Sequence, residues 1–244
     1  MDCRGCLSSH AAIGCSCGEG RSTTSLSPNP ATRRHILQGM IGAAIVGFSH
    51  RARAQSELSP DAALDQLMAG NRRFVDKRMT SFDEDLAILK QNTAAKQAPF
   101  AAVLSCADSR VPTELIFDQS IGHIFVTRVA GNVATNDMIA SLEYGAAVLG
   151  TKAIVVMAHS NCGAAKAAIA GQSVPGQISG LYPYLRGAVE QSGPDIDAVA
   201  RTNARIQANL LATASPVIGG LIGDRKIKVA AAFYDLHSGI VSLL

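Results

Sequence analysis

Residues 100–110 read FAAVLSCADSR, an apolar run that ends in a group of small, polar and charged side chains. The same pattern recurs at residues 153–163, which read AIVVMAHSNCG. A short apolar run without polar alternation is typical of a strand that is buried on both faces of a parallel sheet. The two stretches therefore predict two central strands, each followed by a polar loop at its carboxyl end.

Strand-like and helix-like segments alternate through the chain after residue 55. Strands separated by helices predict a three-layer α/β fold, a mainly parallel sheet flanked by helices on both faces. The first two helices form an N-terminal helical arm, and a Ser-Gly turn near the end predicts an antiparallel edge strand. We expect strands at 100–105, 123–129, 153–158 and 228–236, and helices at 61–75, 83–95, 136–149, 162–170, 181–191 and 196–214.

The first 54 residues differ from the rest and are expected to form an export signal, with one catalytic domain over residues 55–244. They hold six arginines and two acidic residues, a net charge of +4. Arg33 and Arg34 precede a modest apolar segment at 36–48 and then Ala52-Arg53-Ala54, which resembles a twin-arginine signal cleaved after that triplet. The apolar segment is shorter than the roughly 20 residues of a membrane span. We expect an exported chain without stable membrane insertion, periplasmic in a Gram-negative bacterium and otherwise secreted.

The leader also contains Cys3, Cys6, Cys15 and Cys17 around His10. Their spacing, C-x2-C and then C-x-C, fits no common zinc finger, and few apolar residues are present to pack around a metal. Two interpretations of this segment therefore stay open, a small zinc-binding knot and an unstructured, long N-terminal region of the export signal.

The composition of residues 55–244 narrows the choice of partner. With the leader subtracted, the net charge is −1, which does not give the basic footprint of a nucleic-acid-binding protein. Aromatic residues make up 5% of the whole chain and tryptophan is absent, which argues against stacking on bases or sugars. We expect a small polar substrate and no nucleic acid.

The polar loops after the two quoted strands carry residues that suit a metal site. The first supplies Cys106, Asp108 and Arg110, and the second supplies His159 and Cys162. Carboxyl ends of parallel strands meet at one edge of a sheet, so the two loops are expected to converge there. Two thiolates and an imidazole, with an oxygen in the fourth position, form a set that Zn²⁺ accepts tetrahedrally.

The spacing also allows a charge-assisted bond between Asp108 and Arg110, which would hold the carboxylate off the metal. Zinc would then have three protein ligands and a water whose pKa falls to about 7. Simpler alternatives stay open at this point. Cys106 and Cys162 are the only cysteines after the leader and would suit a disulfide in an exported protein. His159 alone would suit a core position.

Three motifs give the chain a family resemblance. CADSRV from Cys106, FVTRVAGN from Phe125 and HSNCGA from His159 resemble the signature blocks of β-carbonic anhydrases, and the resemblance covers residues 61–244. It implies a zinc lyase that reversibly hydrates carbon dioxide to bicarbonate and a proton, by attack of zinc-bound hydroxide. It also implies a homodimer or a dimer of dimers, in which the helical arm embraces a second subunit.

The resemblance assigns roles to the loop residues. It makes Cys106, His159 and Cys162 zinc ligands. It pairs Asp108 with Arg110 as a catalytic dyad and makes Asp108 a fourth ligand when the pair opens.

Two further positions follow from the motifs. Gln119 stands near the family's substrate-binding glutamine, contributed across the dimer interface, although its spacing to Gly122 is one residue longer than in some members. Gly131 and Asn132 are interpreted as a structural turn. The rival functions are hydrolysis of carbonyl sulfide or carbon disulfide at the same ligands, and a non-catalytic exported zinc-binding protein.

Overall fold

The computed structural model describes residues 57–81, 91 and 93–244. The expected leader and most of the expected helix at 83–95 lie outside the described residues. Five strands form one sheet within them, in the order β2-β1-β3-β4-β5. The strands are β1 (Ala101–Ser105), β2 (Ile124–Arg128), β3 (Ala153–His159), β4 (Lys228–Tyr234) and β5 (Val241–Leu243).

The direction of the strands agrees with the sequence prediction. β1, β2, β3 and β4 run parallel, whereas β5 pairs with β4 in the antiparallel sense. The hairpin between β4 and β5 turns at Gly239, whose φ of 76° favours glycine. The mainly parallel sheet and its antiparallel edge strand are therefore confirmed.

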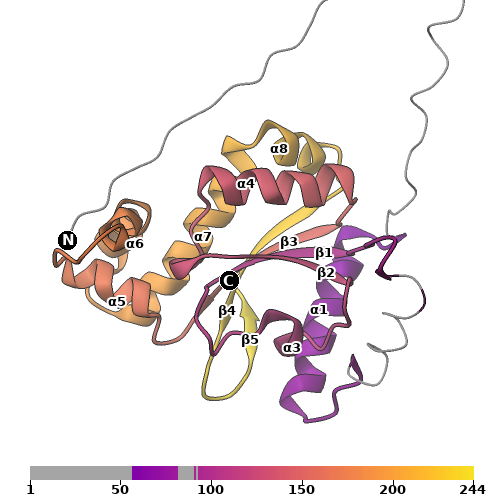
Figure 1. The fold of residues 1–244 in the computed structure, drawn as a ribbon, viewed down its shortest axis with the longest axis horizontal. Helices are drawn as coiled ribbons and strands as arrows, with labels where there is room; N and C mark the ends of the chain where they lie inside the picture. Colours follow the sequence, from indigo (N-terminus) through magenta and orange to yellow (C-terminus); the bar gives the residue numbers. More distant parts are fainter. Residues whose placement is uncertain (1–56, 82–90, 92) are drawn as a thin grey trace, which may run out of the picture. The chain divides into compact units, whose positions relative to one another are not determined.

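Helices cover both faces of this sheet (Figure 1). One face carries α4 (Asn136–Glu143), α7 (Ile196–Ala214) and α8 (Pro216–Gly223). The opposite face carries α1 (Pro60–Val75) and the short α3 (Thr113–Ile116). The predicted three-layer α/β class is confirmed.

Side chains of the central strands alternate between the two helical layers. Leu104 and Ile154 pack in the cluster that includes α7, and Val103 and Val155 pack in the cluster that includes α1. Because each face of the sheet is covered, both sets of side chains are buried. This burial on both faces explains why the strands read as apolar runs without polar alternation.

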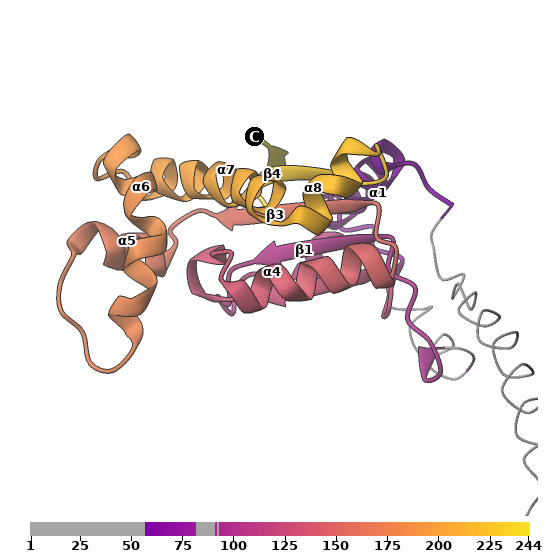
Figure 2. The ribbon, with the colours of Figure 1, turned by 90° about the horizontal axis from the view of Figure 1, so that it is seen from above.

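Two more helices lie beyond the carboxyl ends of the central strands. Figure 2 shows α5 (Gly163–Ala170) and α6 (Tyr182–Ser192) at this end of the sheet, next to the start of α7. α5 begins one residue after Cys162 and ends at Ala170, and the C-cap residue Gly171 adopts a left-handed φ of 60°. The polar loops that follow β1 and β3 therefore open toward these helices.

The sequence did not predict α8. Gly219, Gly220 and Gly223 are poor helix formers, which hid the helix from propensity arguments. The helix forms because Ser215 caps it, accepting a hydrogen bond from the Ile218 amide at 3.0 Å, and because Ile218 is fully buried. The expected helix at 136–149 also differs, since α4 ends at Glu143 and a π-helical turn, Tyr144–Val148, follows.

Helix α1 packs on the sheet of the same chain, and Asn71 fixes it to the β4–β5 hairpin. The Asn71 amide donates to the Gly239 carbonyl at 2.9 Å and to the Ile116 carbonyl at 3.2 Å, and its oxygen accepts from the Val241 amide at 2.8 Å. Leu67, on the inner face of this helix, is fully buried. The first helix of the expected arm is therefore anchored within the chain.

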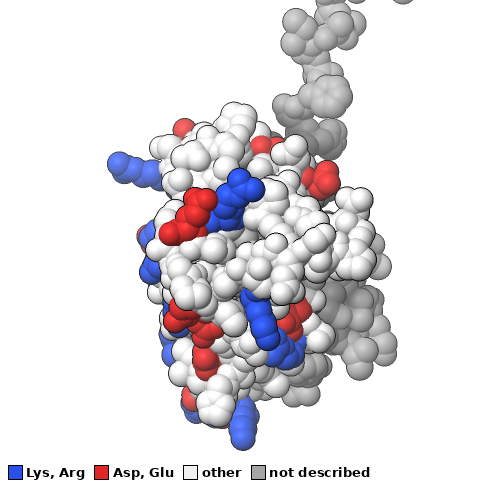
Figure 3. Space-filling model, turned by 90° about the vertical axis from the view of Figure 1, so that its left-hand side faces the viewer, with Lys and Arg blue, Asp and Glu red and all other residues white. Residues whose placement is uncertain are grey.

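The surface over α5 and α6 carries charges of both signs. Figure 3 shows Lys and Arg interspersed with Asp and Glu on this face, without a broad patch of one sign. In the part of the chain that the structure describes, no single helix has the length and apolar character of a membrane span. The pair α7 and α8 meets that test only jointly, with a bend of 88° between them.

Candidate metal centre

The two polar loops converge at the carboxyl edge of the sheet. Cys106 follows β1, His159 ends β3, and Cys162 occupies the N-cap position of α5. Their candidate ligand atoms all lie within 4.8 Å of one another. The side chains are buried, with exposed fractions of 4%, 0% and 2%. The sequence therefore predicted correctly that the two loops meet.

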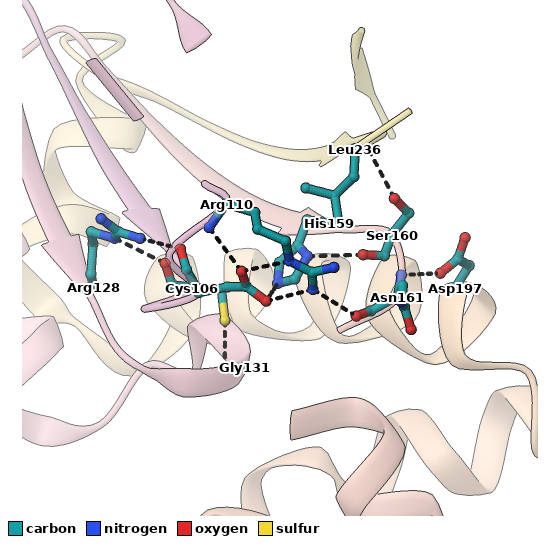
Figure 4. Close-up of polar contacts among 10 residues, drawn as sticks. Cys106, Arg110, Arg128, Gly131, His159, Ser160, Asn161, Asp197 and Leu236 are labelled. Atoms are coloured by element: carbon teal, nitrogen blue, oxygen red, sulfur yellow. Dashed lines mark hydrogen bonds and ion pairs between the residues drawn. The ribbon is translucent and has the colours of Figure 1, made fainter. Parts of the chain in front are cut away.

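The imidazole of His159 is oriented for a metal ion. Its Nδ1 lies 2.9 Å from the Ser160 carbonyl oxygen (Figure 4), which accepts and cannot donate, so Nδ1 carries the proton. Its Nε2 is buried and has no hydrogen-bond partner among the described residues. A histidine whose Nδ1–H is bonded to a carbonyl, with Nε2 left free, is the usual arrangement of a metal ligand. The residues therefore fit a metal.

The two thiols are free and form no disulfide in the structure. A hydrogen bond from the Cys162 thiol, aided by one from the Gly131 amide, lowers the pKa of Cys106 despite burial. The same bond and burial raise the pKa of Cys162. The opposite shifts indicate that Cys162 keeps its proton and donates it to Cys106 Sγ. A cation that binds both thiolates must displace this proton.

Asp108 is next to this cluster but is held by Arg110. Arg110 donates from Nε to Oδ1 at 2.9 Å and from Nη2 to Oδ2 at 2.8 Å, and its own amide also reaches Oδ1. The guanidinium holds the pKa of the Asp108 carboxyl well below its usual range. Oδ2 is 3.8 Å from His159 Nε2. The expected pair is thus formed at the edge of the ligand cluster.

The sequence analysis missed the contacts that two residues, Arg128 and Gly131, make at the site (Figure 4). Arg128, at the end of β2, donates to the Cys106 carbonyl at 2.9 Å and to the Asp108 carbonyl at 2.6 Å. The Gly131 amide donates to Cys106 Sγ at 3.3 Å. Gly131 and Asn132 do form a turn, with φ of 78° and 45°, and this turn also directs the Gly131 amide at the Cys106 sulfur. Arg128 and Gly131 both lie in the quoted FVTRVAGN motif, and this motif was the one feature of the sequence that could have indicated their role.

Comparison with known proteins decides the family. Residues 101–241 match the family model described as carbonic anhydrase. The chain is also 34% identical over 194 residues to carbonic anhydrase 2 of Mycobacterium tuberculosis, covering 74% of this chain and 91% of that protein. The chain belongs to the carbonic anhydrase family. The prediction of a carbonic anhydrase from its three motifs is confirmed, and the sulfur-substrate rival is not favoured.

Solved structures place this carbonic anhydrase in the β class. The Coccomyxa β-carbonic anhydrase, solved with acetazolamide, has a TM-score of 0.58 and 26% identity, covering 74% of this chain and 86% of that one. A structure from Sordaria macrospora, described among two tetrameric β-carbonic anhydrases, has a TM-score of 0.60 and 24% identity, covering 74% and 96%. The second likeness concerns the fold alone.

Gln119 is not brought to the metal centre within one chain of this carbonic anhydrase. It precedes the amino end of β2, whereas the ligand cluster lies at the carboxyl ends of β1 and β3. Its side-chain amide donates to the Phe117 carbonyl at 2.8 Å and is buried beside α1. Its role across a dimer interface stays a prediction.

Proposed function

We propose that this carbonic anhydrase interconverts carbon dioxide and bicarbonate with a zinc ion held by Cys106 Sγ, His159 Nε2 and Cys162 Sγ. The observation that carries the proposal is the buried sulfur–nitrogen–sulfur set, in which Nε2 accepts no hydrogen bond from any residue that the structure describes. Zinc in such a site supplies a nucleophile near neutral pH, since it lowers the pKa of water from about 16 to about 7. The hard cations calcium and magnesium would prefer oxygen ligands.

The role of Asp108 follows from its bond to Arg110. The low pKa of Asp108 keeps the carboxylate ionised at working pH, so it is an acceptor only. Held by Arg110, its Oδ2 lies close enough to the cluster to accept a hydrogen bond from the attacking water and orient it toward the carbon of the substrate. Released from Arg110, the same carboxylate would compete for the metal.

The reaction on carbon dioxide is tested against the sulfur analogues by stopped-flow and gas-consumption assays on the zinc-loaded protein. We expect rapid hydration of carbon dioxide, with carbonyl sulfide and carbon disulfide turned over far more slowly. Inhibition by acetazolamide, with which the Coccomyxa enzyme was solved, is expected as well. Zinc-loaded protein that hydrolyses carbon disulfide and leaves carbon dioxide unchanged would overturn the proposal.

The assembly and the destination of the chain complete the proposal. The enzyme is a homodimer or a dimer of dimers, as the resemblance of its three motifs to β-carbonic anhydrases implies. Light scattering on the purified protein measures this directly. Residues 1–54 direct export through the Arg33–Arg34 pair. Replacing both arginines by lysine should leave the protein in the cytoplasm, and unchanged export would contradict the assignment.

A further inference from the structure

Asn161, between the ligands His159 and Cys162, has a left-handed backbone with φ of 52°. This region is unfavourable for most side chains, and asparagine tolerates it better than most. The conformation turns the Asn161 carbonyl toward Arg110, whose Nη2 donates to it at 3.2 Å. The same Nη2 donates to Asp108 Oδ2. The backbone of Asn161 therefore shares a donor with the Asp108–Arg110 pair.

The Asn161 amide is held by a residue from a different element. Asp197, the second residue of α7, accepts the Asn161 N–H with Oδ1 at 2.8 Å (Figure 4). Two and three residues further on, Val199 and Ala200 are buried in the core cluster that includes the sheet, which holds the start of α7 in place. Asp197 thus connects a rigid helix to the loop that carries two ligands.

Asp197 is not required as the cap of α7. Asp195 occupies the N-cap position and accepts a hydrogen bond from the Ala198 amide at 2.9 Å. An acidic side chain in the first turn does interact favourably with the helix dipole, but that effect needs no contact with Asn161. The hydrogen bond to Asn161 is therefore a separate function of the Asp197 carboxylate.

We propose that Asp197 is a positioning residue that fixes Asn161, aims its carbonyl at Arg110 and so keeps Arg110 bonded to Asp108. The inference rests on the proposed function of the Asp108–Arg110 pair. Without Asp197, Asn161 relaxes from the left-handed region and Arg110 loses one of its anchors. Asp108 is then free more often, and it lies close enough to the ligand cluster to compete for the metal.

A double-mutant cycle with Asp197→Ala and Arg110→Ala tests this coupling. We expect Asp197→Ala to lower kcat on the order of tenfold or more in the wild-type background. In the Arg110→Ala background it should cost nothing further, because Asp197 acts through Arg110. Asp197→Asn keeps an oxygen acceptor for the Asn161 amide and should restore most of the rate. Equal losses in both backgrounds would overturn the proposal.

Asp195→Ala is the matched control, since it weakens the start of α7 without touching Asn161. It should lower the thermal midpoint at least as much as Asp197→Ala and leave kcat close to wild type. If Asp195→Ala lowers kcat as much as Asp197→Ala does, helix stability explains the result and the proposal fails.

Cobalt(II) spectra give a readout that does not depend on catalysis. The visible absorption of the cobalt-loaded protein reports the ligands around the metal. Asp197→Ala should shift the bands in the same direction as Arg110→Ala, with no further shift in the double variant. If the wild type hydrated no carbon dioxide, the proposed function would fail while these spectra still decided the coupling. Spectra unchanged by Asp197→Ala would contradict it.

Discussion

The Oδ2 atom of Asp108 lies 3.8 Å from the Nε2 atom of His159, and the same oxygen accepts a hydrogen bond from Arg110 at 2.8 Å. In the proposed account, this carboxylate has two alternative partners, the guanidinium and a metal ion bound by His159. The structure shows it bonded to the guanidinium through both oxygens. Access of water to the metal then depends on how firmly Arg110 holds.

Loss of the guanidinium should separate metal binding from catalysis. Arg110→Ala is expected to retain zinc and to lower the hydration rate on the order of a hundredfold, because Asp108 is no longer oriented for transition-state stabilisation. Stopped-flow rates are measured beside zinc content. Arg78→Ala removes an arginine whose ion pair with Asp76 is exposed, and it should change neither value. Hydration at the wild-type rate in Arg110→Ala would contradict the catalytic role of the Asp108–Arg110 pair.

The hydrogen bond from Gly131 to Cys106 should matter for metal affinity. Gly131→Ala places a side chain at φ 78°, 3.2 Å from the Ala164 Cβ, so the turn must move. We expect a loss of about 1–3 kcal/mol in stability and a zinc dissociation constant raised by at least about tenfold. Chelator competition measures the second value.

Gly171→Ala is the matched control for that substitution. Its φ of 60° gives a similar backbone penalty, but no atom lies within 4 Å of the new side chain and no ligand is near in sequence. It should lower stability and leave zinc affinity unchanged. Equal affinity losses in the two variants would show that the amide of Gly131 has no special effect on the sulfur.

Removal of the metal should reveal two unequal thiols. Because the hydrogen bond from Cys162 lowers the pKa of Cys106 and the same bond raises the pKa of Cys162, we expect Cys106 to ionise first in the metal-free protein. Iodoacetamide at pH 6, followed by peptide mass spectrometry, should modify Cys106 first. Equal modification of both, rising together near pH 8.5, would refute this order of ionisation.

A second buried carboxylate should give the fold an acid-sensitive component. Asp118 is buried, which alone would raise its pKa, yet bonds from Arg73, Ser81 and Thr80 hold the pKa below its usual value. Because its pKa is lower in the folded than in the unfolded state, the ionised carboxylate stabilises the fold at pH values above its unfolded pKa of about 4. This contribution is lost as the pH falls through the folded-state pKa. Asp118→Asn should therefore cost about 1.5–3 kcal/mol at pH 7, the range for hydrogen bonds to a charged group.

Urea unfolding at pH 7 and at pH 3 measures that contribution. The difference between wild type and Asp118→Asn should shrink at the lower pH. Asp76→Asn, at an exposed ion pair with Arg78, should have little effect at either pH. A difference of equal size at both pH values would mean that the charge of Asp118 is not what stabilises the fold.

The sequence predicted the central strands and their loops because burial on both faces leaves a pattern that local composition reveals. Helix α8 was missed because its three glycines conceal a helix that Ser215 and the burial of Ile218 stabilise. The bond from Asp197 to Asn161 was out of reach for another reason. It spans 36 residues and ends on a backbone atom, which every residue has, so no residue type marks it.

At the site, too, some residues are marked by their type in the sequence and others act through contacts that only the fold creates. Cys106, His159 and Cys162 stand out because their side chains suit a metal and follow predicted strands. Arg128 and Gly131 act through backbone carbonyl and amide groups, whose direction depends on the folded loop. Their contacts therefore required the structure.

The most direct test is to titrate zinc into the metal-free protein while measuring carbon dioxide hydration. The account predicts a rate that rises linearly, stops rising at about one zinc per chain, and is absent in Cys162→Ser at the same zinc concentration. Full hydration activity in zinc-free protein, or zinc saturation without any hydration, would contradict the central claim.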